Sequence, residues 1–255
     1  MSMKNYVILL AGGVGKRMQT DIPKQFIVVE GRPILVHTAE RFQCNPQIES
    51  IVIVCVAEWI DNLRSLVEKY SLTKVRWIIE GGSTGHDSIR NGVFFLKDKI
   101  DSDDYIVVHD AVRPILPQKA IDEVIRVSHE KGNASSSIAC HPPIVYTEDF
   151  ESGIADVDRE HVMLTASPQA FRYGLALKCY EKAEEENMHN FTFTSSLPVS
   201  YTHLPVKARM DGEYVEHIGI RLDCICFLKT ITSVLKHDGI VEGGTGEIKR
   251  QRDRG

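Results

Sequence analysis

The sequence predicts an α/β fold in which a mostly parallel, twisted sheet lies between two layers of helices, giving three layers in all. Two observations support this prediction. Short apolar runs rich in β-branched residues recur along the chain, as is typical of strands buried on both faces. Segments with apolar residues at helical spacing alternate with these runs, and a βαβα order favours parallel strands. Ligands of such sheets bind at the carboxyl ends of the strands.

The predicted strands are five apolar runs. The first, YVILL at residues 6–10, stops at a glycine-rich turn, where the chain must leave the sheet. The other four are SIVIVCV (50–56), VRWII (75–79), YIVVHD (105–110) and SSSIAC (135–140). Each run is bounded by polar or turn-forming residues, so each is interpreted as one buried strand.

The predicted helices lie between these strands. The segment 118–131 places Ile121, Val124 and Ile125 on one face and ends at Gly132, a residue type that favours helix C-termini. The other segments interpreted as helices are 59–70, 88–97 and 172–187.

The segment 141–165 breaks the alternation. It contains two prolines, followed by two short extended runs around Glu151-Ser152-Gly153, and this predicts a projecting β-hairpin arm. We expect one domain over residues 1–230 with the arm inside it. The remaining residues, 231–255, are glycine-rich and then charge-dense, which predicts an atypical, disordered tail.

Composition restricts the class of protein. With 255 residues and 43% hydrophobic residues the chain can bury a full core. The net charge of −5 gives no basic surplus, so a nucleic-acid partner is not expected. No apolar run is long enough for a membrane span, and six cysteines without CxxC spacing indicate buried thiols in a reducing cytoplasm. The histidines and cysteines show no ligand-spaced cluster that would predict a zinc site.

Residues 10–26, LAGGVGKRMQTDIPKQF, form the most informative stretch. The P-loop pattern GxxxxGK[ST] is not met, and the dinucleotide pattern GxGxxG would need glycine where Met18 stands. What remains is a flexible loop whose backbone N–H groups can wrap an anion, with Lys16, Arg17 and Lys24 close by. This combination favours a triphosphate ligand. The alternative is a turn with solvated charges.

The order LAGGxGxRM followed by PKQF resembles the sugar-phosphate and polyol-phosphate nucleotidyltransferases. Four further stretches are similar to the cytidylyltransferases that make CDP-polyols, namely the methylerythritol-phosphate and ribitol-5-phosphate enzymes. These stretches are EGGSTGHDSIRNG (80–92), VVHDAVRP (107–114), DVDREH (156–161) and SPQAF (167–171). The resemblance covers roughly residues 5–195, ends near residue 197, and implies a Rossmann-like nucleotidyltransferase fold.

The resemblance also implies partners. The substrates would be CTP and a polyol phosphate, the cofactor Mg²⁺, and the assembly a homodimer formed through the arm, in isoprenoid or teichoic-acid (cell-wall) biosynthesis. The residues that would hold the nucleotide come from the turns after the predicted strands. They are Ala11, Gly12, Gly13, Gly15, Gly81, Gly82, Asp87, Ser88 and Ala111.

The remaining implied residues bind phosphates, metal or acceptor. Arg17 and Lys24 would grip the CTP phosphates, and Arg113 would position a phosphate. In-line attack on the α-phosphorus needs no essential acid or base, because cations and a carboxylate-held metal stabilise the developing charge. The carboxylates expected to hold Mg²⁺ are Asp110 and Glu216, and the residues expected to contact the polyol phosphate are Arg159 and Thr147.

Each of these residue types also has a structural use. Asp110 could be a helix N-cap or a strand-end turn residue, and Ser88 could simply begin the helix 88–97. Arg159 could be a surface charge on the arm. His109, alone at the end of a predicted buried strand, is more often a hydrogen-bonded structural residue than a catalytic one.

The chain departs from the family at two places. Val145 and Tyr146 stand where the family has an Asp-Thr pair on the arm, and Gly219 stands where it has a lysine at the α-phosphate. Two alternatives therefore stay open: a catalytically impaired CTP-binding homologue, and a sugar-1-phosphate nucleotidyltransferase that uses another base. The LAGG turn and Trp59 in AEWID favour ribitol 5-phosphate over methylerythritol phosphate as the acceptor.

Overall fold

The computed structural model describes residues 3–13, 22–149, 151–186 and 208–209, and the structural statements below concern these residues. Contacts group Met1–Asp211 into one compact unit, which holds every element described here. The predicted tail over 231–255 lies outside the described residues, so the predicted domain boundaries stay predictions.

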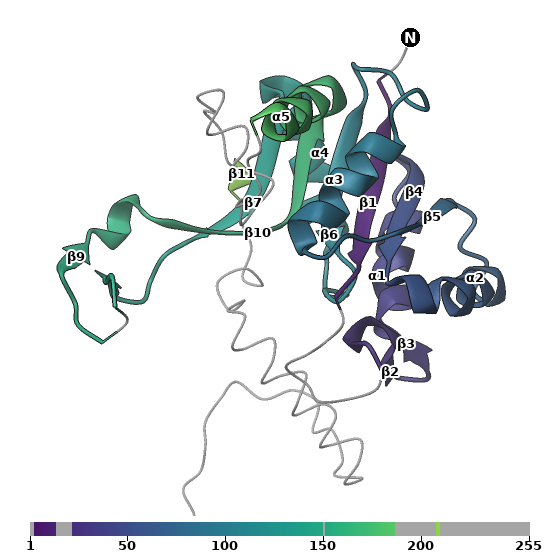
Figure 1. The fold of residues 1–255 in the computed structure, drawn as a ribbon, viewed down its shortest axis with the longest axis horizontal. Coiled ribbons are helices and arrows are strands. Elements are labelled where there is room, and N and C mark those ends of the chain that lie inside the picture. The colour runs from purple at the N-terminus through teal and green to yellow at the C-terminus, as the bar shows by residue number, and fades with distance from the viewer. Residues whose placement is uncertain (1–2, 14–21, 150, 187–207, 210–255) are drawn as a thin grey trace, which may run out of the picture. The chain divides into compact units, whose positions relative to one another are not determined.

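The centre of this unit is a seven-stranded sheet with the order β11-β7-β10-β6-β1-β4-β5 (Figure 1). Strands β6, β1, β4 and β5 pair parallel with one another, and β11 pairs parallel with β7, whereas β10 pairs antiparallel with both β6 and β7. The mostly parallel sheet is thus confirmed, and β10 is an additional strand that the sequence did not indicate. The bounds are β1 (Asn5–Ala11), β4 (Ile48–Cys55), β5 (Val75–Glu80), β6 (Tyr105–Asp110), β7 (Asn133–Ala139), β10 (Met163–Arg172) and β11 (Ala208–Arg209).

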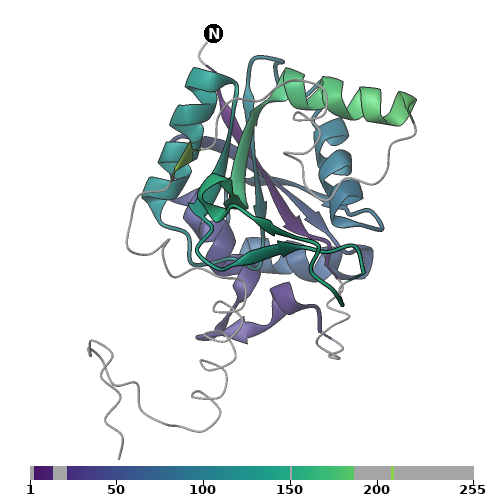
Figure 2. The same ribbon diagram turned by 90° about the vertical axis from the view of Figure 1, so that its left-hand side faces the viewer.

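Helices cover both faces of this sheet. One apolar core lies between the sheet and α1, α2 and α4, and the other lies between the sheet and α3 and α5. Figure 2 shows the sheet with α4 on one side and α3 and α5 on the other. The bounds are α1 (Ile34–Gln43), α2 (Ile60–Lys69), α3 (Gly85–Phe95), α4 (Gln118–Lys131) and α5 (Tyr173–Glu185). Helix α1, which begins directly after Pro33, was not predicted.

Strand β1 shows why the sheet is buried on both faces. Val7 and Leu9 belong to the core under α1 and α4, whereas Tyr6 and Ile8 belong to the core under α3. Alternate residues of a strand point to opposite faces, so a continuous apolar run fits a strand covered on both sides. This packing fixes the register in which β1 delivers its carboxyl end to the site.

Short elements complete the unit. The hairpin of β2 (Val28–Val29) and β3 (Arg32–Pro33) turns at Glu30 and Gly31, both with positive φ, as a tight two-residue turn requires. Three 3₁₀ helices are η1 (Lys24–Phe26), η2 (Ala57–Trp59) and η3 (Arg159–His161). No helix within the described ranges is long and apolar enough to cross a membrane.

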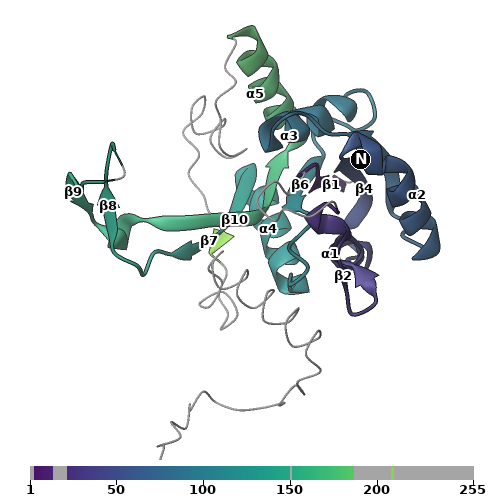
Figure 3. The same cartoon turned by 60° about the horizontal axis from the view of Figure 1, so that its bottom comes forward.

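The predicted arm contains a second small hairpin. Strands β8 (Ile144–Tyr146) and β9 (Ala155–Val157) pair antiparallel, and Figures 1 and 3 show them away from the main sheet. Of the cysteines, Cys55, Cys140 and Cys179 are buried as expected, whereas Cys44 is exposed at the end of α1. Cys224 and Cys226 lie outside the described residues.

Candidate active site

The predicted site residues of the sheet collect at the carboxyl ends of four neighbouring strands. Leu10 of β1 is in register with Asp110 of β6. On the other side of β1, Ala11 is in register with Cys55 of β4. The Gly81 N–H after β5 donates to the Cys55 carbonyl over 2.8 Å, which joins the fourth strand end to this edge. Gly15, Arg17 and Glu216, all predicted site residues, lie outside the described residues.

Glycines in the turns after β1 and β5 pack so closely against the first turn of α3 that an added side chain would force its neighbours to move. A Cβ on Gly12 would lie 2.9 Å from Ser88 Oγ, and a Cβ on Gly81 would lie 3.0 Å from the same atom. At Gly82 an added Cβ would lie only 2.1 Å from Asp87 Cβ. We call Gly12, Gly81, Gly82 and Ser88 the glycine cradle. Backbone bare of side chains can approach a ligand closely, as the nucleotide-binding prediction requires.

Ser88 connects the cradle to helix α3. Its buried Oγ accepts a hydrogen bond from the Gly82 N–H at 3.1 Å and donates one to the Thr84 carbonyl at 2.9 Å. Thr84 is the N-cap of α3, so the alternative that Ser88 begins this helix is wrong. The hydroxyl instead holds the loop after β5 against the first turn of the helix.

Asp87 completes the helix cap. Its Oδ2 accepts hydrogen bonds from Ser83 Oγ at 2.6 Å and from the Thr84 N–H at 3.1 Å, while Thr84 Oγ1 accepts from the Asp87 N–H at 3.0 Å. This reciprocal capping box satisfies backbone donors at the start of α3. The hydrogen bond from Ser83, followed by those from Thr84, holds the pKa of Asp87 below its usual value.

Lys24 lies beside the turn that follows β1. It begins η1 after Pro23, and its Cε is 3.5 Å from the position that a Cβ on Gly13 would occupy. The next residue, Gln25, is buried and donates from Nε2 to the Ala11 carbonyl over 2.6 Å. Gln25 therefore fixes η1, and with it Lys24, to the end of β1. Reasoning from sequence did not single out Gln25, although it lies within the PKQF motif.

Asp110 and Arg113 form an ion pair at the end of β6. Arg113 Nε lies 2.7 Å from Asp110 Oδ2, and the two side chains are 32% and 39% exposed. The Arg113 N–H donates to the Asp110 carbonyl over 3.2 Å, so the chain turns directly after the strand. Asp110 is not an N-cap, because α4 begins at Gln118 after Pro117. Asp110 is instead a strand-end turn residue, which is the other structural use considered for it above, and its carboxylate is half-exposed.

The donor set at Asp110 is compatible with Mg²⁺. Among the described residues, one carboxylate oxygen, Oδ2, is engaged by Arg113 and approached by Ser167 Oγ at 3.5 Å, and no hydrogen bond occupies Oδ1. A single carboxylate with an open oxygen suits Mg²⁺, which takes most of its ligands from phosphates and water. Within the described part of the chain, no three His, Cys, Asp or Glu residues cluster as a complete metal site would require.

His109 lies beneath this turn. Its Nε2 is 3.1 Å from the Arg113 carbonyl oxygen, and its ring meets Phe42 of α1 edge-on with centroids 5.3 Å apart. Complete burial lowers the pKa of His109 to about 4, and the neighbouring Arg113 cation acts in the same direction. The hydrogen bond to the Arg113 carbonyl and the charge of Asp110 act against this lowering. The imidazole is therefore neutral at neutral pH.

The arm residues are not brought to this edge within the chain. Thr147 Oγ1 donates to Asp149 Oδ1 at 3.0 Å, and Arg159 donates to the His141 carbonyl at 2.8 Å. Asp149 also accepts the N–H groups of the turn at the arm's tip, and these bonds lower its pKa, the one from Ser152 most. Figure 3 shows the arm apart from the ends of β1 and β6. The acceptor-binding role of Thr147 and Arg159 stays a prediction.

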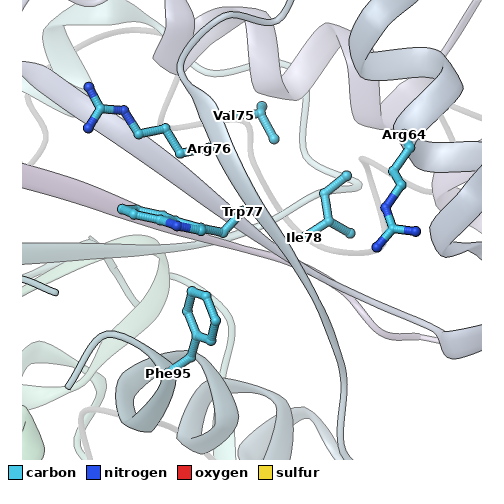
Figure 4. Close-up of a pocket in the computed structure, with 6 residues that line it drawn as sticks. All are labelled: Arg64, Val75, Arg76, Trp77, Ile78 and Phe95. Carbon is cyan, nitrogen blue, oxygen red and sulfur yellow. The ribbon is translucent and has the colours of Figure 1, made fainter. Parts of the chain in front are cut away.

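A hollow of about 340 Å³ lies along the edge strand β5, between residues of α2 and α3 (Figure 4). Trp77 and Phe95 line one part of it and Ile78 and Arg64 another. None of the predicted site residues that the structure describes lines it. The candidate site therefore lies at the carboxyl ends of β1, β4, β5 and β6, and not in this hollow.

Comparison with known proteins identifies relatives over most of the chain. The family model described as 2-C-methyl-D-erythritol 4-phosphate cytidylyltransferase matches residues 5–197. Ribitol-5-phosphate cytidylyltransferase of Lacticaseibacillus paracasei is 36% identical over 198 residues, which are 77% of this chain and 85% of that protein. 2-C-methyl-D-erythritol 4-phosphate cytidylyltransferase of Syntrophus aciditrophicus is 35% identical over 190 residues, 74% of this chain and 80% of that protein.

Solved structures share the fold. The 4-diphosphocytidyl-2C-methyl-D-erythritol synthase of Anaerococcus prevotii superposes with a TM-score of 0.72 at 22% identity, covering 91% of this chain and 96% of that one. The 2-C-methyl-D-erythritol 4-phosphate cytidylyltransferase of Francisella tularensis superposes with a TM-score of 0.69 at 24% identity, covering 82% and 91%. At these identities the likeness shows the fold alone.

Proposed function

The chain belongs to the 2-C-methyl-D-erythritol 4-phosphate cytidylyltransferase family, and we propose that it transfers the cytidylyl group of CTP to a polyol phosphate. An oxygen of the acceptor's phosphate attacks the α-phosphorus of CTP, the bond from this phosphorus to the bridging oxygen breaks, and diphosphate leaves. The products are a CDP-polyol and diphosphate. Both family relatives described above are named as cytidylyltransferases.

The observation that carries this proposal is the convergence of three groups at one sheet edge. The glycine cradle, Lys24 and the Asp110–Arg113 turn follow β1, β5 and β6, and β1 stands in register with β6. The cradle offers close approach to the cytosine and ribose, while Lys24 and Arg113 offer fixed positive charge to the phosphates. A transfer through an in-line transition state requires mainly positioning and charge stabilisation, which such groups supply.

Asp110 would hold Mg²⁺ in this account. Bound there, the ion would neutralise charge on the triphosphate as diphosphate leaves. The carboxylate must then share its oxygens between the metal and Arg113, which lies 2.7 Å from Oδ2. Arg113 in turn has further N–H donors for a phosphate, because only Nε faces Asp110 in this pair.

We propose ribitol 5-phosphate as the acceptor. Five relatives named ribitol-5-phosphate cytidylyltransferase are 36–38% identical to this chain, whereas three named 2-C-methyl-D-erythritol 4-phosphate cytidylyltransferase are 33–35% identical. This acceptor would place the enzyme in teichoic-acid biosynthesis, and the other in isoprenoid biosynthesis. The thiols of Cys55, Cys140 and Cys179, buried and unpaired, support a reducing cytoplasm as the location.

The arm supports a homodimer. Val145, Tyr146 and Ile154 expose about half of their surfaces on the small β8–β9 hairpin. A second copy of the chain would cover these apolar side chains and bring Arg159 and Thr147 of one arm to the strand-end site of the other copy.

Diphosphate release tests the proposal. The full chain is incubated with CTP and Mg²⁺ and with ribitol 5-phosphate or 2-C-methyl-D-erythritol 4-phosphate in parallel, and diphosphate is measured by a coupled assay. We expect turnover with CTP, faster with ribitol 5-phosphate. Binding of CTP without turnover on either acceptor would instead support the impaired homologue, the alternative suggested by Gly219 in place of the family's lysine. Thermal stabilisation by another nucleoside triphosphate rather than CTP would support the sugar-1-phosphate alternative.

A further inference from the structure

The turn that carries Asp110 and Arg113 is held from beneath by buried side chains. Within the turn, the Ala111 N–H donates to the Leu10 carbonyl at 2.9 Å, which connects it to β1. Thr38 of α1, fully buried, places its Oγ1 2.8 Å from the Ala111 carbonyl oxygen. These two contacts hold the beginning of the turn.

His109 holds the end of the same turn. Its side chain is 1% exposed, and Nε2 lies 3.1 Å from the Arg113 carbonyl oxygen. A carbonyl oxygen can only accept, so Nε2 carries the hydrogen and Nδ1 is the bare acceptor nitrogen. Among the described residues Nδ1 has no hydrogen-bond partner. The imidazole thus makes one hydrogen bond, and that bond ends on Arg113.

Packing alone does not explain an imidazole here. A buried acceptor without a partner destabilises the folded state by roughly 1–3 kcal/mol. A phenyl ring would meet Phe42, whose ring centroid is 5.3 Å from that of His109, without leaving such an acceptor. The feature that a phenyl ring cannot reproduce is the N–H directed at the Arg113 carbonyl.

We propose that His109 is a positioning residue for the cytidylyl transfer, which fixes the backbone of Arg113 and thereby aims the side chains of Arg113 and Asp110 at the CTP phosphates. The inference rests on the proposed function of this site. His109 is buried beneath the turn and acts through Arg113, so it touches no substrate itself.

The size of the effect follows from the geometry of transfer. Displacement of a positioned group by about 1 Å can lower a rate on the order of 100-fold. Loss of the contact between His109 and Arg113 removes the side-chain support of the end of the turn, whereas the Arg113 N–H bond to the Asp110 carbonyl and both ties of Ala111 remain. We therefore expect kcat to fall roughly 10- to 100-fold, with a smaller change in KM for CTP.

Three variants of the full chain test this role. H109F keeps an aromatic ring and removes the N–H, whereas H109Q keeps an N–H donor at a similar distance from the backbone. H109N keeps the amide but is one methylene shorter. We measure kcat and KM for CTP with the acceptor that the wild type turns over, at a temperature well below the Tm of each variant. Expected values of kcat are low for H109F and H109N and within about fivefold of wild type for H109Q.

The outcomes separate the two claims. A folded H109F with the kcat of the wild type, or H109Q as impaired as H109F, overturns the positioning role, because a merely structural role would lower Tm and leave kcat unchanged. If H109F does not fold, equal kcat values for H109Q and H109N overturn it instead. A wild-type chain that releases no diphosphate from CTP contradicts the proposed function rather than the role of His109.

Discussion

Of the glycines described in the candidate nucleotide site, Gly82 has the least room for a side chain. In G82A the new Cβ would lie 2.1 Å from Asp87 Cβ and 2.9 Å from the Asp87 carbonyl carbon. Ordinary van der Waals contact begins at 3.4 Å, so the loop or the first turn of α3 must move by about 1.3 Å. Asp87 is held by the capping box with Thr84, and this displacement must strain or break it.

The structure sets the magnitude. Overpacking of this kind costs about 1–3 kcal/mol, and loss of a helix N-cap costs about 1 kcal/mol. The hydrogen bond from the Gly82 N–H to Ser88 Oγ, 3.1 Å long, lies in the same cradle and shifts with the loop. We expect G82A to lower the free energy of unfolding by about 2 kcal/mol and to raise the Kd for CTP tenfold or more, since tenfold corresponds to about 1.4 kcal/mol.

Calorimetric titration with CTP and Mg²⁺, together with thermal unfolding, measures both effects. The matched control is G85A, in the first turn of the same helix, because a Cβ on Gly85 meets nothing within 4 Å. Alanine at a helical position stabilises by up to about 1 kcal/mol relative to glycine, so this control should keep the wild-type Kd and Tm or raise Tm slightly. G82A with the Kd and Tm of the wild type would refute the close-approach argument.

Three more substitutions probe other parts of the site. R113M should lower kcat on the order of 100-fold, because the Arg113 charge acts on the transition state. Its Tm should stay close to wild type, because a half-exposed ion pair adds little stability. Unchanged kcat in steady-state assays would contradict this. Q25L removes the buried donor to the Ala11 carbonyl and should lower the free energy of unfolding by about 1–3 kcal/mol in urea titrations, whereas a midpoint equal to wild type would show that this bond does not anchor η1. The hydrogen bond from Ser83 is the main cause of the lowered pKa of Asp87, so the carboxylate stabilises the fold above its unfolded pKa near 3.8 and loses this contribution as pH falls below that value. The Tm difference between wild type and D87N should therefore shrink from pH 6 to pH 3. A constant difference would argue against the cap.

The sequence was most informative where one local signal decides the structure. Runs such as YVILL and YIVVHD predicted buried parallel strands because β-branched apolar residues suit strands covered on both faces. The glycines after YVILL predicted a turn at which the chain leaves the sheet, and the structure brings Gly12 of this turn against Ser88. In both cases the residue type itself limits the conformations that fit.

The sequence was less informative where tertiary contacts decide. Strand β10 contains Pro168 and mixed polarity, which argue against a strand, but a register shift between Ala166 and Gln169 accommodates the proline between two partner strands. The sequence did not single out Thr38, because its structural role is a contact with Ala111, which lies 73 positions further along the chain. Such partners become visible only when the strand ends are assembled at one edge of the sheet.

A crystal structure of the full chain grown with CTP and Mg²⁺ tests the central claim most directly. We expect the cytosine and ribose against Gly81, Gly82 and Ser88, the phosphates within reach of Lys24 and Arg113, and the metal bound to Asp110. A nucleotide bound elsewhere, for example in the hollow beside β5, or a metal away from Asp110, would contradict the assignment of this sheet edge as the active site.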